Sequence, residues 1–238
     1  MQNIAEFVDE RQKTWCIHCA KTICEVETNR DHVPTKSLLK NPYPCNLPVV
    51  TICKDCNLSF SLDEEYFVSF LSSVLVGSTD PSIQFIPAAR RILSRNIKLR
   101  ARIDDSRDEV VISDNCPKNC FRPEVDRISR IILKNARGHA FFEYGEPMLN
   151  DPTHVLFTPL EMLTQKQRDS FLTINPQKFW PEVGSRMMTR VISGQDLFKS
   201  WVVVQDEVYR YAIVQQGGVL VRTVLYEYLA TEVYWEEF

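Results

Sequence analysis

The feature that most constrains this chain is a pair of cysteine motifs with identical spacing, Cys16-x-x-Cys19 and Cys53-x-x-Cys56. Each motif can place two sulfurs on one side of a tight turn, and two such motifs complete a tetrahedral four-cysteine zinc site. The 33 residues between Cys19 and Cys53 exceed the gap of a common zinc ribbon, so a substantial insert must loop out. Structural zinc of this kind fastens a small domain that lacks a large core. We therefore expect a zinc-stapled unit in the first third of the chain.

The composition is that of an ordinary globular protein, with 44% hydrophobic and 25% charged residues. Eight cysteines in 238 residues are too few for a disulfide scaffold. We expect the paired cysteines to bind metal in a reducing, cytoplasmic environment. No signal peptide and no apolar run of ~18–20 residues is visible, which argues against a membrane partner. The net charge of −3 argues against a protein that binds polyanions with its whole surface. Contacts with nucleic acid would therefore need local basic patches.

The pattern along the chain predicts an α+β protein with two domains, residues 1–77 and 78–238, divided at a cluster of turn-forming residues. Residues 62–76 have helical apolar spacing, and Ser61 with Glu64 fits a capping box. Residues 123–142 predict a helix, whereas the segment 86–103 fits a helix or a strand. Strand composition marks four later segments: 187–192, 201–205, 208–214 and 219–225. The second domain is thus expected to combine helices with an antiparallel sheet and to recognise substrate or a partner.

The residues around the cysteine motifs carry a family resemblance. The insert contains Asp31-His32-Val33-Pro34, and Asn57 follows the second motif directly. The pattern CIHC…DHVPTKSLL…ICKDCN resembles the HNH (ββα-metal) endonuclease superfamily. It is most similar to zinc-stapled members, including recombination endonuclease VII and bacterial proteins with a DHVP-type motif. The resemblance covers residues 14–70, under a third of the chain.

The resemblance implies a β-hairpin packed on a helix, with a metal ion and the scissile phosphate between them. It matches His32 to the general base, and Asp31 and Asn57 to ligands of a catalytic Mg²⁺ or Mn²⁺. The histidine that such proteins often carry on the helix has no match here, a pattern shared by the zinc-stapled members. Glu64 could add a carboxylate to the metal site, although its capping role is favoured. Neutral imidazole is a suitable proton acceptor near pH 7, and Lys36 could hold phosphate.

Two basic patterns lie outside that segment. If helical, each would form a stripe on one face, either solvated or in contact with phosphate. The first consists of Arg91, Arg95, Lys98 and Arg102, and the second of Arg127, Arg130, Lys134 and Arg137. The second is the better candidate for phosphate contact, because acidic residues closely follow the first.

These observations lead to two hypotheses from different classes. The first is a metal-dependent endonuclease that hydrolyses phosphodiester bonds in nucleic acid, with DNA favoured over RNA. The second is a non-catalytic zinc module that binds nucleic acid or protein. Asp31 beside His32 favours the enzyme, because a binding module has no use for a base next to a ligand for a hard metal ion. The oligomeric state is not indicated by the sequence.

Overall fold

The computed structural model describes residues 1–4, 13–112, 116–174, 180–215 and 217–236. The described part of the chain is a mixed α+β fold with two small two-stranded sheets and one larger antiparallel sheet. None of the helices described is long and apolar enough to cross a membrane.

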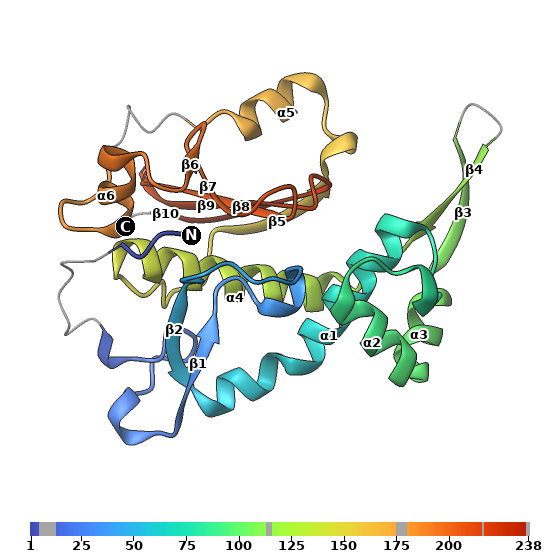
Figure 1. The fold of residues 1–238 in the computed structure, drawn as a ribbon, viewed down its shortest axis with the longest axis horizontal. Coiled ribbons are helices and arrows are strands. Elements are labelled where there is room, and N and C mark those ends of the chain that lie inside the picture. Colours follow the sequence, from blue (N-terminus) through green and yellow to red (C-terminus); the bar gives the residue numbers. More distant parts are fainter. Residues whose placement is uncertain (5–12, 113–115, 175–179, 216, 237–238) are drawn as a thin grey trace.

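The N-terminal region contains a β-hairpin followed directly by a long helix (Figure 1). Strand β1 (Thr28–His32) pairs antiparallel with β2 (Val49–Cys53), so that Asp31 lies opposite Val50. Helix α1 (Lys54–Val76) starts at the residue after β2. Two short 3-10 helices, η2 (Ile23–Glu25) and η3 (Lys36–Leu38), lie on either side of β1. The strands place the cysteine motifs and the Asp-His pair at the two ends of one hairpin.

Helix α1 begins eight residues earlier than the apolar spacing predicts. Cys53 is its N-cap, and the Cys53 thiol accepts a hydrogen bond from the backbone N–H of Cys56. Ser61 therefore lies inside the helix, and the predicted capping box of Ser61 with Glu64 is wrong. Lys54, Asp55, Leu58 and Ser59 in the first turns are exposed, so no apolar periodicity marks the start. Gly77 ends the helix in the left-handed conformation, with φ of 69°.

The central part of the chain forms short helices, a hairpin and a second long helix. In chain order these are η4 (Pro81–Ile83), α2 (Pro87–Arg95), α3 (Ile97–Asp104), β3 (Arg107–Ile112), β4 (Cys116–Phe121) and α4 (Val125–Tyr144). The segment that fitted a helix or a strand is thus helical, with a break at Asn96, whose side chain caps α3 through the Leu99 N–H. Figure 1 shows the β3–β4 hairpin projecting from the body of the protein. Helix α4 confirms the helix predicted for residues 123–142.

The C-terminal region is built on a six-stranded antiparallel sheet of order β5-β10-β9-β8-β7-β6. The strands are β5 (His154–Pro159), β6 (Leu197–Phe198), β7 (Trp201–Gln205), β8 (Tyr209–Gln215), β9 (Gly218–Leu225) and β10 (Leu229–Glu236). Between β5 and β6 lie η5 (Leu160–Met162), α5 (Gln165–Leu172) and α6 (Arg186–Ser193). Three of the four predicted strand segments are therefore strands, and the α+β class is confirmed.

The fourth segment, residues 187–192, is helix α6 and not a strand. Ser185 caps this helix by accepting a hydrogen bond from the Met188 N–H, and Gly194 ends it with φ of 71°. Met187 and Arg190 on one face of α6 are buried. The caps and this helical spacing outweigh the strand preference of the local composition.

The sheet has an apolar layer on each face. One face packs on α4 through side chains such as Tyr211, Val221 and Val233. Val224 and Ala230 on the other face cluster with Phe171 of α5. The layer shared with α4 also includes buried side chains of α1, α2 and α3. The hydrophobic core therefore runs across the predicted boundary at residue 77, and independent folding of residues 1–77 stays a prediction.

Candidate metal centre and adjoining polar cluster

The four cysteines of the two motifs converge at one end of the hairpin. Their sulfur atoms all lie within 4.8 Å of one another, and Cys19 Sγ is 3.7 Å from Cys53 Sγ. A tetrahedral zinc with Zn–S bonds of ~2.3 Å has sulfur–sulfur edges of about 3.8 Å. Among the described residues this is the one group of histidine, cysteine and acidic side chains arranged to hold a metal ion. The cluster can therefore hold a metal such as zinc.

Local backbone geometry aims these sulfurs inward. Cys16 and Cys19 flank a tight turn in which the Ala20 N–H donates to the Cys16 carbonyl over 2.9 Å. Cys53 is the last residue of β2, and Cys56 lies in the first turn of α1. The Cys53 N–H also points at Cys16 Sγ, 3.4 Å away. The metal-binding turns thus tie the segment before β1 to the junction of β2 and α1.

The thiols resist simultaneous ionisation in the absence of a cation. Burial raises the pKa of Cys16, but backbone N–H groups from Cys53 and neighbouring residues outweigh it, so that the net pKa is lowered. Burial and the neighbouring thiols raise the pKa of Cys56. A bound cation relieves this conflict, because thiolates are the form that binds metal and a metal offsets their mutual repulsion.

A second polar cluster lies where β1, α1 and α4 meet, and we call it the Lys134 cluster. Lys134 Nζ is 2.9 Å from Asp31 Oδ1, 2.5 Å from Glu64 Oε1 and 3.0 Å from Thr35 Oγ1. The Thr35 hydroxyl in turn donates to Glu64 Oε1 over 2.6 Å, and the Thr35 N–H donates to Asn135 Oδ1. An ammonium has three donors, so every donor of Lys134 has an acceptor.

The Lys134 cluster is almost closed to water at Lys134 and Asp31, whereas the Glu64 side chain is 24% exposed. Lys134 is 2% exposed and Asp31 is 8% exposed. Burial raises the pKa of Asp31, an effect that Lys134 opposes and Glu64 reinforces. Glu64 therefore acts as an ion-pair partner of Lys134 rather than as a capping residue. The cluster joins three elements that are far apart in the sequence.

His32 is the last residue of β1 and lies next to this cluster in sequence. Successive residues of a strand point to opposite faces, which separates the buried Asp31 side chain from the half-buried His32 ring. Burial, Lys36 and Arg30 lower the pKa of His32 below its usual 6.5. The imidazole is therefore neutral at pH 7 and can accept a proton.

The remaining expected site residues are not joined to Asp31. Asn57 lies in the first turns of α1, half-buried, and no hydrogen bond within the described residues connects it to Asp31. Lys36 lies exposed on η3. The structure thus brings Asp31, Glu64 and Lys134 together, and it places Asn57 and Lys36 on neighbouring elements.

The predicted basic stripe of α4 is divided between partly exposed arginines that pair with α1 and residues that are buried. Arg127 and Arg130 both pair with Asp63, each at 2.6 Å. Arg137 donates to the carbonyl of Asn150 over 3.0 Å, and it is buried, as is Lys134. Lys134 and Arg137 are therefore not exposed to a phosphate in this arrangement, and phosphate contact by the stripe stays a prediction. Sequence reasoning also missed Thr35 and Asn135, since no local pattern marks either residue.

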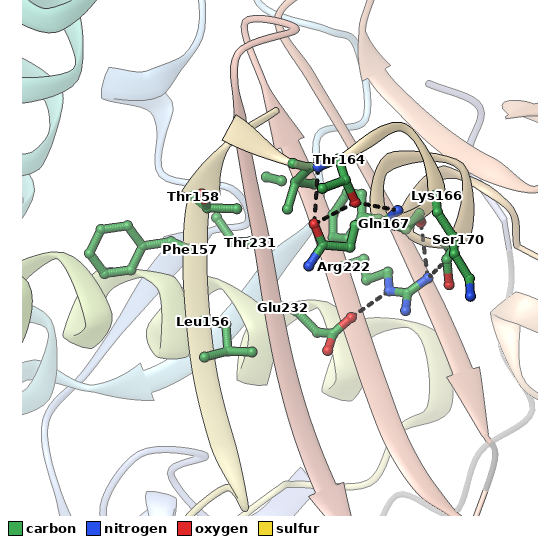
Figure 2. Close-up of a pocket in the computed structure, with 13 residues that line it drawn as sticks. Leu156, Phe157, Thr158, Thr164, Lys166, Gln167, Ser170, Arg222, Thr231 and Glu232 are labelled. Carbon is green, nitrogen blue, oxygen red and sulfur yellow. Dashed lines mark hydrogen bonds and ion pairs between the residues drawn. The ribbon is translucent and has the colours of Figure 1, made fainter. Parts of the chain in front are cut away.

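A cavity of about 760 Å³ lies between α5 and the sheet, on the face opposite to α4 (Figure 2). Its charged groups are Lys166 and the pair of Arg222 with Glu232, whose side chains are 2.7 Å apart. Arg222 also donates to the carbonyls of Ser170 and Phe171. The polar groups at its centre thus satisfy one another, and the cavity contains none of the expected site residues.

Comparison with protein-family models, with curated proteins and with solved structures finds no significant match to this chain. Function must therefore be inferred from the residues themselves.

Proposed function

We propose that the protein is an HNH-type endonuclease that hydrolyses phosphodiester bonds in nucleic acid, with DNA favoured as substrate. The observation that carries this proposal is His32, a partly exposed imidazole of lowered pKa beside a buried carboxylate at the end of a β-hairpin. The hairpin is followed at once by a helix, the order that the resemblance implies.

His32 is the proton acceptor in this proposal. Hydrolysis needs a base that takes a proton from the attacking water and is unprotonated at the working pH. The lowered pKa of His32 meets the second requirement. The positive charges of Lys36 and Arg30, which contribute to that shift, also favour a phosphate group nearby.

The four cysteines serve as a structural zinc site. A closed set of four thiolates leaves no position for water or substrate, which is typical of structural zinc and not of catalytic zinc. The site would fix the segment before β1 to the start of α1 and would thereby hold the hairpin against the helix.

The catalytic ion expected at Asp31 and Asn57 is Mg²⁺ or Mn²⁺, and oxygen donors suit these hard ions. When bound, such an ion stabilises negative charge on the phosphate. In the arrangement described, however, the Lys134 ammonium contacts both Asp31 and Glu64. The donor atoms have the right chemistry, but the position of Asp31 does not fit an ion shared with Asn57 while the Lys134 ammonium contacts its carboxylate. We therefore assign no catalytic step to the ion.

The second candidate is a non-catalytic zinc module that binds nucleic acid or protein. The same contacts favour it, because a buried ion-pair network with every lysine donor satisfied is also what a purely structural junction requires.

Cleavage by His32 variants distinguishes the two candidates. Labelled single- and double-stranded DNA and RNA are incubated with the protein in Mg²⁺, in Mn²⁺ and without added divalent ion. We expect His32→Ala to lower the cleavage rate by about a hundred- to ten-thousand-fold with little change in substrate affinity. The wild-type rate should fall only at a pH below about 6.5, because the pKa of His32 is lowered.

The matched control is His154→Ala, which removes a partly exposed histidine on β5 that pairs with Glu232. Its cleavage rate should equal that of the wild type. If His32→Ala cuts as fast as the wild type, or if the wild type cuts no substrate with either ion, the nuclease proposal fails and the zinc module stands.

A further inference from the structure

Helices α2 and α3 carry a dense group of positive charges. Between Pro81 and Ile103 the sequence has no aspartate or glutamate, and six basic residues fall within positions 90–102. They are Arg90, Arg91, Arg95, Lys98, Arg100 and Arg102. The chain as a whole has a net charge of −3, so the positive charge of this segment is opposite in sign to the charge of the whole protein.

Apolar packing turns these charges toward solvent. Helix α2 buries Ala89 and Leu93, and α3 buries Leu99 and Ile103. All six basic side chains are exposed. The basic stripe that the sequence ranked second is therefore fully on the surface, whereas Lys134 and Arg137 of the α4 stripe are buried and its two other arginines pair with Asp63.

Half of these six basic residues have no charged or hydrogen-bonding partner among the described side chains. Arg90 donates to the Gln84 carbonyl, Arg102 pairs with Glu124, and Arg100 interacts electrostatically with Asp80. Arg91, Arg95 and Lys98 form no ion pair or hydrogen bond with any described side chain, and we call these three the α2–α3 basic surface. The arginines of α4 and Arg190 of α6 are instead paired with acids or carbonyls.

The α2–α3 basic surface is structurally connected to the candidate site. Helix α2 packs on α1 and on η3, and η3 begins with Lys36, four residues after His32. Figure 1 shows α2 and α3 beside the C-terminal half of α1. The α2–α3 basic surface therefore lies on helices that pack on α1 and η3, the two elements next to the β1–β2 hairpin.

We infer that the α2–α3 basic surface binds the phosphate backbone of a nucleic acid duplex. The inference rests on the proposed function for the identity of the polyanion, while the surface itself follows from exposure and charge. A lipid surface fits less well, because a membrane-bound helix inserts an apolar face and the apolar faces of α2 and α3 are in the core. Ile97, 74% exposed, is a single apolar side chain among the charges.

Salt-dependent binding of the full-length protein tests this inference. Affinity for a fluorescent duplex of ~20 base pairs is measured by anisotropy at several salt concentrations, without added divalent ion so that cleavage does not interfere. The variant Arg91→Ala/Arg95→Ala should bind about tenfold or more weakly near 0.15 M salt. Its plot of log affinity against log salt should be shallower by about 1.8, since each lost phosphate contact accounts for ~0.9.

The matched control is Lys166→Ala/Arg168→Ala, which removes two exposed charges from α5 and should bind as the wild type does. Circular dichroism checks folding, and Arg95→Ala/Lys98→Ala replaces the first variant if that one is unfolded. Equal affinity and slope for the variant and the control would overturn the inference. It would also be overturned if the wild type bound vesicles containing phosphatidylglycerol but not the duplex.

The two proposals fail separately. If the variant binds the duplex more weakly and the wild type never cuts nucleic acid, the binding surface is supported and the nuclease proposal is refuted. If the variant cuts and binds as the wild type does, the binding surface is refuted and the nuclease proposal is unaffected.

Discussion

Lys134 is the residue on which the candidate site depends most directly. Its ammonium is buried between Asp31 and Glu64, whose negative charges would otherwise face each other with little water around them. Removing one member of a buried ion pair leaves an uncompensated charge, whereas exposed ion pairs contribute little to stability.

We therefore expect Lys134→Met to lower the free energy of unfolding at pH 7 by about 3–5 kcal/mol. The matched control is Arg130→Met, on the same helix but with a side chain that is 44% exposed, which should cost at most about 1 kcal/mol. Urea denaturation measures both values.

The loss caused by Lys134→Met should also shrink as the pH falls. Without the ammonium, the folded-state pKa of Asp31, already raised by burial, rises further above its unfolded value, so the penalty applies only where this carboxylate is ionised. A deficit that is equal at pH 5 and pH 7, or equal for the two variants, would contradict the buried ion pair.

At the scale of elements, the packing of α4 against the hairpin depends on Gly138. A methyl group built on Gly138 would lie 2.6 Å from Cγ2 of Val33 and 2.9 Å from its Cγ1. At an open helix position, replacing glycine with alanine stabilises a protein by roughly 0.5–1 kcal/mol. At position 138 the contact with Val33 makes the same substitution destabilising instead.

We expect Gly138→Ala to destabilise the protein by about 1–3 kcal/mol and to slow cleavage, because Val33 follows His32 directly. Val33→Ala removes the crowded methyl groups, so the double variant should be more stable than the sum of the single effects predicts. Thermal unfolding of the three variants measures this coupling, and strict additivity would count against the clash.

The sequence predicts elements best where the signal is local. The cysteine spacing and the apolar face of α4 are readable because each depends on a few neighbouring residues, whereas the hairpin around Asp31 was expected only from the family resemblance. The start of α1 and the helix α6 were missed because caps and solvent-facing polar turns decide them. The orientation of the two basic stripes cannot be read from spacing, since Asp63 and Asp31, which attract the stripe of α4, come from α1 and β1.

At the scale of the whole molecule, the four-cysteine site and the core support each other. Helix α1 starts at the metal-binding turns and then packs on α2 and α4, and α4 in turn covers one face of the sheet. Loss of the metal should therefore destabilise the packing of α1 on α2 and α4 as well as the turns that contain the cysteines.

We expect about one zinc per chain by elemental analysis, and Cys53→Ser to lose it together with the structure of the N-terminal region. Cys24→Ser, which changes an exposed cysteine outside the cluster, should retain the metal. Zinc content and circular dichroism are measured on the same samples. Folded wild-type protein without zinc would exclude the structural zinc site.

The long sequence separation inside the Lys134 cluster has a consequence for synthesis. Lys134 follows Asp31 by 103 positions, so at ~5–20 residues per second it leaves the ribosome on the order of ten seconds later. Both cysteine motifs are complete well before that, and the nascent chain can acquire its metal first. Asp31 and Glu64 stay hydrated until α4 arrives. The emergence of α4 is therefore the event that buries Asp31 and gives both carboxylates their cationic partner during translation.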